Sequence, residues 1–163
     1  MTPPRRLIVL RHAKAVGAGP GGGDHGRHLE AQGRREAAEV GLLLGAHGWM
    51  PDRVVSSDSQ RTRETWEAVA PALSSSVTAD FDARLYLADV EQIESILSGM
   101  DEACRTVLVL GHNPGLSDAV TRWTGIPVDL ATSEVALLEG APVGWAQVGT
   151  VRWRVVELLR SGG

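Results

Sequence analysis

Residues 106–115 read Thr106-Val107-Leu108-Val109-Leu110-Gly111-His112-Asn113-Pro114-Gly115, and they set the class of fold. An unbroken run of β-branched and aliphatic residues predicts a strand that is buried on both faces, as in parallel sheets covered by helices. Asn113 suits the N-cap of a following helix and Pro114 its first position. We therefore expect a strand, a short loop and then a helix that reaches Thr124.

The same alternation runs through the rest of the chain. Further strands are predicted at Leu7–Leu10, Arg53–Ser56 and, more weakly, Val77–Phe81. Helices are predicted at Arg34–His47, from a cap at Ser57 or Asp58 to Leu73, and after a cap at Asp89. The segments Glu134–Leu138 and Val151–Leu159 are predicted to form a hairpin. Alternating strands and helices give a largely parallel sheet with helices on both sides. The prediction is a single α/β domain over residues 1–163, a three-layer sandwich with an antiparallel edge hairpin.

Composition excludes several classes of protein. The 163 residues include 16 Lys and Arg against 20 Asp and Glu, a net charge of −4, so nothing draws the whole chain to nucleic acid or anionic lipid. No apolar run approaches the ~20 residues that span a bilayer, and the N-terminal sequence does not fit a secretory signal. Cys104 is the single cysteine, which excludes an internal disulfide and a multi-cysteine metal site. We expect a cytoplasmic protein that binds neither nucleic acid nor membrane.

Basic residues follow three of the predicted strands. Arg11 and His12 come directly after Leu7–Leu10, His112 follows Leu110 by two positions, and Arg61 lies in the first turn of the helix after Arg53–Ser56. The carboxyl ends of parallel strands share one edge of the sheet, where ligands bind. Two guanidinium groups, two imidazoles and two helix N-termini suit a phosphoryl dianion, with a carboxylate as the weaker alternative. One imidazole can attack phosphorus while the other, if protonated, holds the phosphate.

Four segments resemble signatures of the histidine phosphatase superfamily. Leu10-Arg11-His12-Ala13 resembles its Arg-His-Gly motif, residues 56–65 (SSDSQRTRET) its Ser-Ser-Pro-x-x-Arg-Ala-x-x-Thr segment, and Gly111-His112-Asn113 its second-histidine motif. Residues 24–33 (DHGRHLEAQG) are similar to the Asp-x-x-Arg-Pro-Leu-x-x-x-Gly stretch of the small SixA-type phosphohistidine phosphatases.

The resemblance implies a phosphoglycerate-mutase-like fold and a phosphatase that needs no metal or other cofactor. It implies that His12 becomes phosphorylated, that Arg11 and Arg61 clamp the phosphate, and that His112 is the second imidazole of the pocket. Arg27 and Asn113 are expected as further phosphate or substrate contacts. A metal site at Asp24, His25 and His28 is disfavoured, because the residues are closely spaced in the glycine-rich surface loop 17–26.

The sequence departs from the family pattern in three places. Ala13 stands where the family has glycine. This replacement is tolerated only if the backbone at this position does not need a positive φ. Asp58 stands in place of proline. The glutamate that serves larger members as general acid is missing from residues 83–88 (ARLYLA), and Asp82 and Asp89 flank the gap. An alkoxide leaving group needs a proton, whereas the P–N bond of phosphohistidine is already labile, so the gap favours a phosphoramidate substrate.

Three hypotheses remain open on this basis. The first is a phosphatase for phosphohistidine on a protein, acting through a phosphorylated His12. The second is a phosphatase for small phosphomonoesters or nucleotides, with Asp82, Asp89 or water supplying the proton. The third is a binding module that kept the phosphate pocket but lost turnover. A nucleotide kinase or a serine hydrolase is poorly supported, because neither a P-loop nor a Gly-x-Ser-x-Gly motif is present.

Overall fold

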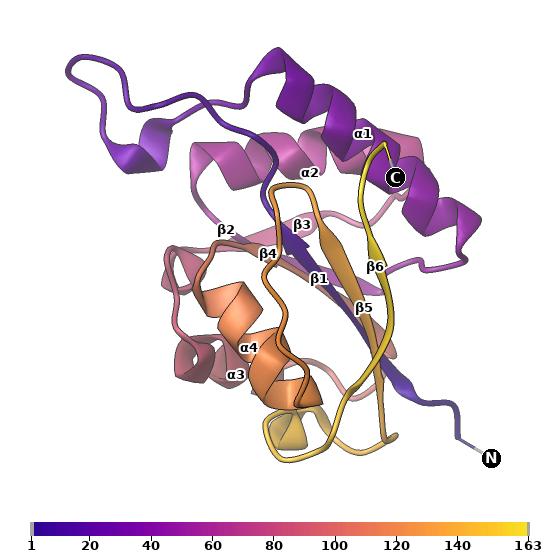
Figure 1. The fold of residues 1–163 in the computed structure, drawn as a ribbon. Coiled ribbons are helices and arrows are strands. Elements are labelled where there is room, and N and C mark those ends of the chain that lie inside the picture. Colours follow the sequence, from indigo (N-terminus) through magenta and orange to yellow (C-terminus); the bar gives the residue numbers. More distant parts are fainter. Residues whose placement is uncertain (1, 163) are drawn as a thin grey trace.

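The computed structural model describes residues 2–162 and contains one six-stranded sheet with helices on both faces (Figure 1). The elements in chain order are β1 (Arg5–Arg11), η1 (Asp24–Gly26), α1 (Ala31–Ala46), β2 (Arg53–Ser57), α2 (Gln60–Leu73), β3 (Ala79–Asp82), η2 (Ala83–Leu85), α3 (Val90–Ser98), β4 (Thr106–Gly111), α4 (Gly115–Thr124), β5 (Val135–Gly140), η3 (Trp145–Gln147) and β6 (Arg154–Leu159). No helix within residues 2–162 is both long and apolar enough to cross a membrane.

The strands lie in the order β3-β2-β4-β1-β5-β6. The first four are mutually parallel, and β5 and β6 run antiparallel at one side. This confirms the predicted mostly parallel sheet with an antiparallel edge hairpin. The central pair, β1 and β4, is in a register that sets Arg11 opposite Gly111, so the chain leaves both strands at the same level.

The two faces of the sheet carry separate apolar cores. Along β1, Leu7 and Val9 face α3 and α4, whereas Ile8 and Leu10 face α1 and α2. All four side chains are fully buried. Each such side chain contributes about 1.5–3 kcal/mol on burial. A strand covered on both faces has no polar side, which explains its unbroken apolar sequence.

Some predicted boundaries were wrong. The cap of α2 is Ser59, whose hydroxyl accepts a hydrogen bond from the Thr62 amide, instead of Ser57 or Asp58. Helix α4 begins at Gly115 with Pro114 as its N-cap, one position later than predicted. Asn113 still contacts this helix, because its side-chain oxygen accepts a hydrogen bond from the Ser117 amide. These shifts leave the strand ends in place.

Strand β6 begins at Arg154 and is therefore shorter than the predicted Val151–Leu159, and a 3₁₀ turn at residues 145–147 precedes it. In that turn Trp145 stacks on Trp153 with 6.2 Å between ring centroids. Strand β3 begins at Ala79 and not at Val77. The glycine-rich loop projects from the body of the molecule at the upper left of Figure 1, and its base is closed by a bridge between Ala15 and Leu29.

Candidate active site

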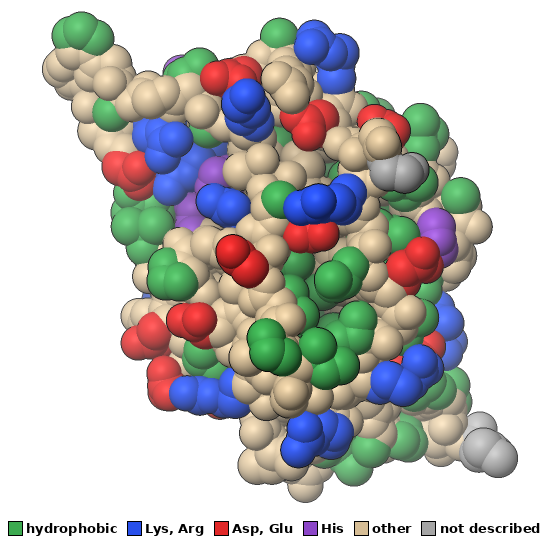
Figure 2. Space-filling model, viewed as in Figure 1, with side chains coloured by type: hydrophobic (Ala, Val, Ile, Leu, Met, Phe, Trp, Pro, Cys, Tyr) green, Lys and Arg blue, Asp and Glu red, His purple; other side chains and the backbone are tan. Residues whose placement is uncertain are grey.

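The structure brings Arg11, His12, Arg61 and His112 together at the carboxyl edge of the parallel strands. Because Arg11 and Gly111 are paired across β1 and β4, the next residues place two imidazoles side by side. The ring centroids of His12 and His112 are 5.3 Å apart. Arg61 reaches them from the first turn of α2, with one guanidinium nitrogen 3.2 Å from Nδ1 of His112. Figure 2 shows histidine side chains beside a group of Lys and Arg side chains below the projecting loop.

The backbone around His12 fixes which of its ring nitrogens is free. Nδ1 lies 2.8 Å from the Ala13 carbonyl oxygen, which can only accept, so Nδ1 carries the proton. Nε2 is left with its lone pair. The Ala13 amide donates to the Thr65 hydroxyl, which in turn donates to the Arg61 carbonyl, at 2.9 and 2.7 Å. Ala13 does not have a positive φ, so it replaces the family's glycine without backbone strain.

His112 is held as the opposite tautomer. Arg61 donates to its Nδ1, and its Nε2 therefore carries the proton and donates to the Ser57 hydroxyl at 2.8 Å. Ser57 is the last residue of β2 and was not singled out by the sequence. Both nitrogens of His112 are thus engaged, whereas His12 presents a free one.

Both imidazoles are neutral at pH 7. Burial, together with the charges of Arg61, Arg11 and Arg27, lowers the pKa of His12 to about 4, against the hydrogen bond to Ala13. Burial and the neighbouring Arg61 likewise lower the pKa of His112 to about 3. Neither imidazole can therefore hold a phosphate as a cation at pH 7, and the positive charge of the site comes from the arginines.

Each of the two site arginines has an unused buried donor. The guanidinium of Arg11 donates to the Leu130 carbonyl at 2.9 Å, and that of Arg61 is held by His112 and Asp24. The Nε atoms of both are buried and lack a hydrogen-bond partner. A buried N–H without an acceptor costs about 1–3 kcal/mol. These two unpaired donors leave both guanidinium groups with hydrogen-bonding capacity that the protein itself does not use.

Asp24 belongs to the site although it was not among the predicted catalytic or phosphate-binding residues. Its carboxylate accepts hydrogen bonds from Arg61 at 3.0 Å, from Arg27 at 3.1 Å and from the Tyr86 hydroxyl. Its backbone oxygen also accepts from Arg61, at 2.8 Å. The ring of Tyr86 packs edge-on against His112, with centroids 5.4 Å apart. The glycine-rich loop thus places the Asp24 carboxylate in the wall of the pocket.

Arg27 lies at the rim, where its Nε donates to the Val16 carbonyl at 2.7 Å and its charge acts on His12. Asn113 does not fit the expected substrate contact. Its amide nitrogen donates to the Leu130 carbonyl at 2.8 Å, and its amide oxygen accepts from the amide and hydroxyl of Ser117. Both ends of the side chain are used to hold neighbouring segments, so Asn113 supports the pocket.

The two aspartates considered as proton donors have other partners. Asp82 binds Arg84 at 2.7 Å, and this hydrogen bond is the main reason that its pKa is lowered. Asp89 forms a capping box with Gln92 at the start of α3. Neither carboxyl group is among the contacts of Arg61 or His112.

The loop histidines do not form a metal site with Asp24. His25 binds Asp58, the residue in the family's proline position, at 2.9 Å. His28 binds the buried Glu64 at 2.8 Å. Within residues 2–162, no group of three or more His, Cys, Asp or Glu side chains is arranged to hold a metal ion.

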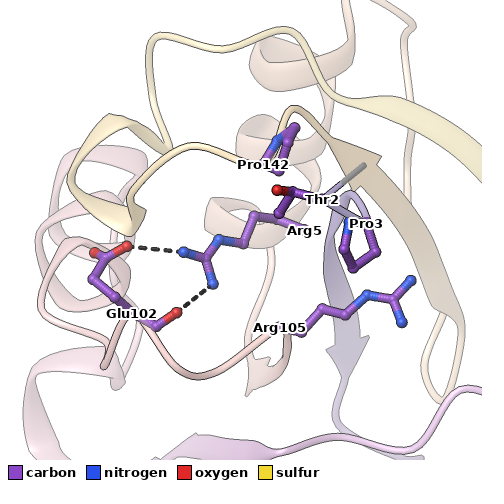
Figure 3. A pocket seen from close by; sticks show the side chains of 6 residues that line it. All are labelled: Thr2, Pro3, Arg5, Glu102, Arg105 and Pro142. Carbon is purple, nitrogen blue, oxygen red and sulfur yellow. Dashed lines mark hydrogen bonds and ion pairs between the residues drawn. The ribbon is translucent and has the colours of Figure 1, made fainter.

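A separate pocket lies at the other end of β1, lined by Thr2, Pro3, Arg5, Glu102, Arg105 and Pro142 (Figure 3). The Arg5 guanidinium there is already bound by the carboxylate and carbonyl of Glu102, both at 2.8 Å. This pocket is remote from the paired imidazoles, because Arg5 begins the strand that His12 follows.

Comparisons with known proteins identify a matching family model and a curated relative. The family model of the histidine phosphatase superfamily (branch 1) matches residues 7–96, which include Arg11, His12 and Arg61. An uncharacterized chloroplastic protein of Arabidopsis thaliana is 30% identical over 168 aligned residues, covering 95% of this chain and 77% of the relative.

Solved structures share the fold over nearly the whole chain. The protein assigned as phosphohistidine phosphatase SixA in Agrobacterium tumefaciens matches with a TM-score of 0.83 and 28% identity, covering 96% of this chain and 97% of that one. The protein histidine phosphatase SixA in complex with tungstate matches at 0.82 with 21% identity, covering 95% and 96%. A mycobacterial glucosyl-3-phosphoglycerate phosphatase matches at 0.69 with 18% identity, covering 96% and 100%. At 21% and 18% identity the likeness is one of fold.

Proposed function

The chain belongs to the histidine phosphatase superfamily (branch 1) and is SixA-like, and from this we propose that it hydrolyses phosphohistidine on a protein through a phosphorylated His12. Membership of the family supports phosphatase activity in general. The choice of phosphohistidine rests on the chemistry of the pocket. The observation that carries it is a neutral His12 with a free Nε2, close enough to Arg11 and Arg61 for their charges to act on it.

The first step is an attack by Nε2 of His12 on the phosphorus of the substrate. The imidazole is neutral at pH 7 and its proton is kept on Nδ1 by the Ala13 carbonyl, so the lone pair on Nε2 is available. Arg11 and Arg61 stabilise the charge that spreads over the phosphoryl oxygens in the transition state. The substrate's P–N bond breaks and its electron pair returns to the leaving imidazole.

The second step is the attack of water on phosphorylated His12. The His12–phosphorus bond breaks, its electron pair returns to Nε2, and the products are neutral His12 and inorganic phosphate. His112 lies beside the phosphoryl group and donates through Nε2 to Ser57, so that its Nδ1 remains directed at Arg61. We assign it the role of holding Arg61 in position to clamp the phosphate.

The pocket wall favours a phosphoramidate over an alkyl ester. Cleavage of an alkyl ester requires a proton for the departing alkoxide. Asp82 and Asp89 are bound elsewhere, and Asp24 is held ionised by three hydrogen bonds. None of these groups is a ready proton donor, whereas imidazole leaves more readily.

The experiment is to trap the intermediate by rapid quench with a ³²P-labelled phosphoramidate. We expect an acid-labile, base-stable phosphoryl group on His12 that His12→Ala abolishes. A matched control is His47→Ala, because His47 also has Nδ1 at 2.8 Å from a backbone carbonyl but lies outside the pocket. Normal turnover in His12→Ala would exclude the mechanism.

A phosphatase for small phosphomonoesters is the second candidate, because the fold is shared with a mycobacterial glucosyl-3-phosphoglycerate phosphatase. The dependence of rate on the leaving group separates the two. Phosphoramidate turnover far above that of alkyl phosphates supports the first, and comparable rates support the second. We propose a phosphorylated protein as the partner, with a phosphorylated metabolite as the alternative. The cytoplasmic location stays a prediction.

A further inference from the structure

The Asp24 carboxylate is held by three donors and still has capacity for a fourth. Oδ2 accepts from Arg61 and from the Tyr86 hydroxyl, whereas Oδ1 accepts only from Arg27. Each carboxylate oxygen can accept two hydrogen bonds, so Oδ1 has one position left. The side chain is 45% exposed, and an incoming group can reach it.

Asp24 is linked to His112 through Arg61 and Tyr86, because both residues bind Asp24 and both contact the His112 ring. In phosphoryl transfer the nucleophile and the leaving group lie on opposite sides of phosphorus. With Nε2 of His12 as the nucleophile, we expect the leaving group at the wall formed by Asp24, Tyr86 and His112.

We propose that Asp24 is a specificity residue that accepts a hydrogen bond from the distal ring N–H of the substrate's phosphorylated imidazole. This inference rests on the proposed function, since it concerns the leaving group of phosphohistidine. It assigns to the glycine-rich loop a direct part in the choice of substrate.

The hydrogen bond would keep the substrate in its reactive form. A phosphorylated imidazole that carries a proton on its distal nitrogen is an imidazolium. When its P–N bond breaks, the electron pair returns to the ring, which leaves as neutral imidazole with the distal proton still in place. His12 becomes the phosphorylated imidazolium in exchange, so the charges balance and the enzyme supplies no proton.

The same carboxylate would disfavour esters. Hydrogen bonds from Tyr86, Arg27 and Arg61 lower the pKa of Asp24 far below its usual value, with Tyr86 contributing most. An ionised carboxylate has no proton to give to a departing alkoxide and repels its negative charge. It attracts an imidazolium for the same reason, so one group both favours phosphohistidine and disfavours alkyl phosphates.

The test compares Asp24→Asn with the wild-type protein on two substrates: phosphoimidazole and p-nitrophenyl phosphate, whose leaving group needs no proton. We expect kcat for phosphoimidazole to fall about 10- to 100-fold, the effect of losing one charge-assisted hydrogen bond. The rate with p-nitrophenyl phosphate should also fall, because Asp24 holds Arg61, but it should fall less, so that the ratio of the two rates drops. Asp80→Asn is the matched control, because Asp80 also pairs with an arginine and is 55% exposed, yet lies in β3.

An equal loss on both substrates would overturn the inference, because it would show that Asp24 only holds Arg61 in place. No loss on either substrate would overturn it as well. Failure of the proposed function gives a different result: the wild-type protein would not turn over phosphoimidazole, or would do so without a phosphoryl group on His12. Thermal unfolding of Asp24→Asn at the wild-type temperature shows that the variant is folded.

Discussion

Replacing Arg61 by alanine tests the electrostatics of the pocket most directly. The Arg61 side chain is 3% exposed, contacts His112 and Asp24, and keeps one buried Nε donor without a partner. The variant removes the donor and the positive charge at once. We therefore expect two separate effects, one on the rate of phosphoryl transfer and one on the neighbouring imidazoles.

The rate effect follows from the loss of a transition-state contact. Removing one preorganised donor to a developing oxyanion lowers kcat by about 10²–10³, or about 2.7–4 kcal/mol. Arg61 makes such a contact in a buried setting, so Arg61→Ala should slow formation of phosphorylated His12 by that factor. Single-turnover rapid quench at saturating phosphoramidate measures this step alone.

The imidazole effect has a definite sign. Arg61 lowers the pKa values of both His12 and His112, to about 4 and about 3 together with burial. Removing a positive charge favours the protonated form. Both pKa values should therefore rise in Arg61→Ala, which an NMR titration of the ring protons detects.

Arg63→Ala is the control, because Arg63 lies two positions away on the same helix and packs its guanidinium over Phe81. It should leave both the transfer rate and the two pKa values unchanged. The reasoning is refuted if Arg61→Ala forms phosphorylated His12 within threefold of the wild-type rate. It is equally refuted if the His112 pKa stays where it is.

Two further predictions concern stability. In Gly33→Ala the new Cβ would lie 2.2 Å from the Lys14 carbonyl oxygen, so calorimetry should show a loss of about 1–3 kcal/mol in the free energy of unfolding. The control is Gly45→Ala on the same helix, whose Cβ meets only Leu73 at 3.7 Å and which should gain up to about 1 kcal/mol in the same quantity. Equal melting temperatures would contradict this. Burial opposes the ionised form of Glu64, but its hydrogen bonds outweigh burial and lower the pKa. The ionised Glu64 carboxylate therefore stabilises the fold above its ordinary pKa of 4.5, and this contribution is lost as the pH falls through the pKa of the folded state. We expect Glu64→Gln to lower the free energy of unfolding by about 2 kcal/mol at neutral pH and by less in acid, as measured by urea unfolding. A loss of unfolding free energy in Glu64→Gln that does not change with pH would contradict this prediction.

The fold and the central site were predictable because they depend on local pattern. Leu7–Leu10 and Thr106–Leu110 are apolar at every or nearly every position, which only a doubly covered strand tolerates. Once these strands are parallel neighbours, the residues that follow them must meet, and His12 and His112 do so.

The parts that were missed depend on contacts between distant segments. Asp24 lies in a loop without hydrophobic periodicity, and nothing local indicates that it returns to Arg61, 37 positions further on. The neutral state of His112 results from burial and nearby cations, which appear only when the chain is folded. The role of Asn113 changed for a similar reason, since its partner Leu130 is 17 positions away.

The pairing of Arg11 with Gly111 has a consequence for how such a molecule can change. The distance between the two imidazoles is set by hydrogen bonds inside the sheet, and a slip of one residue would turn every side chain of the strand to the opposite face. The glycine-rich loop carries no such constraint, because insertions in surface loops cost little. Loops of other lengths could therefore be inserted between Ala15 and Asp24 to redirect the enzyme to new phosphorylated partners, while Asp24 keeps its bond to Arg61 and the reacting pair stays at its present spacing.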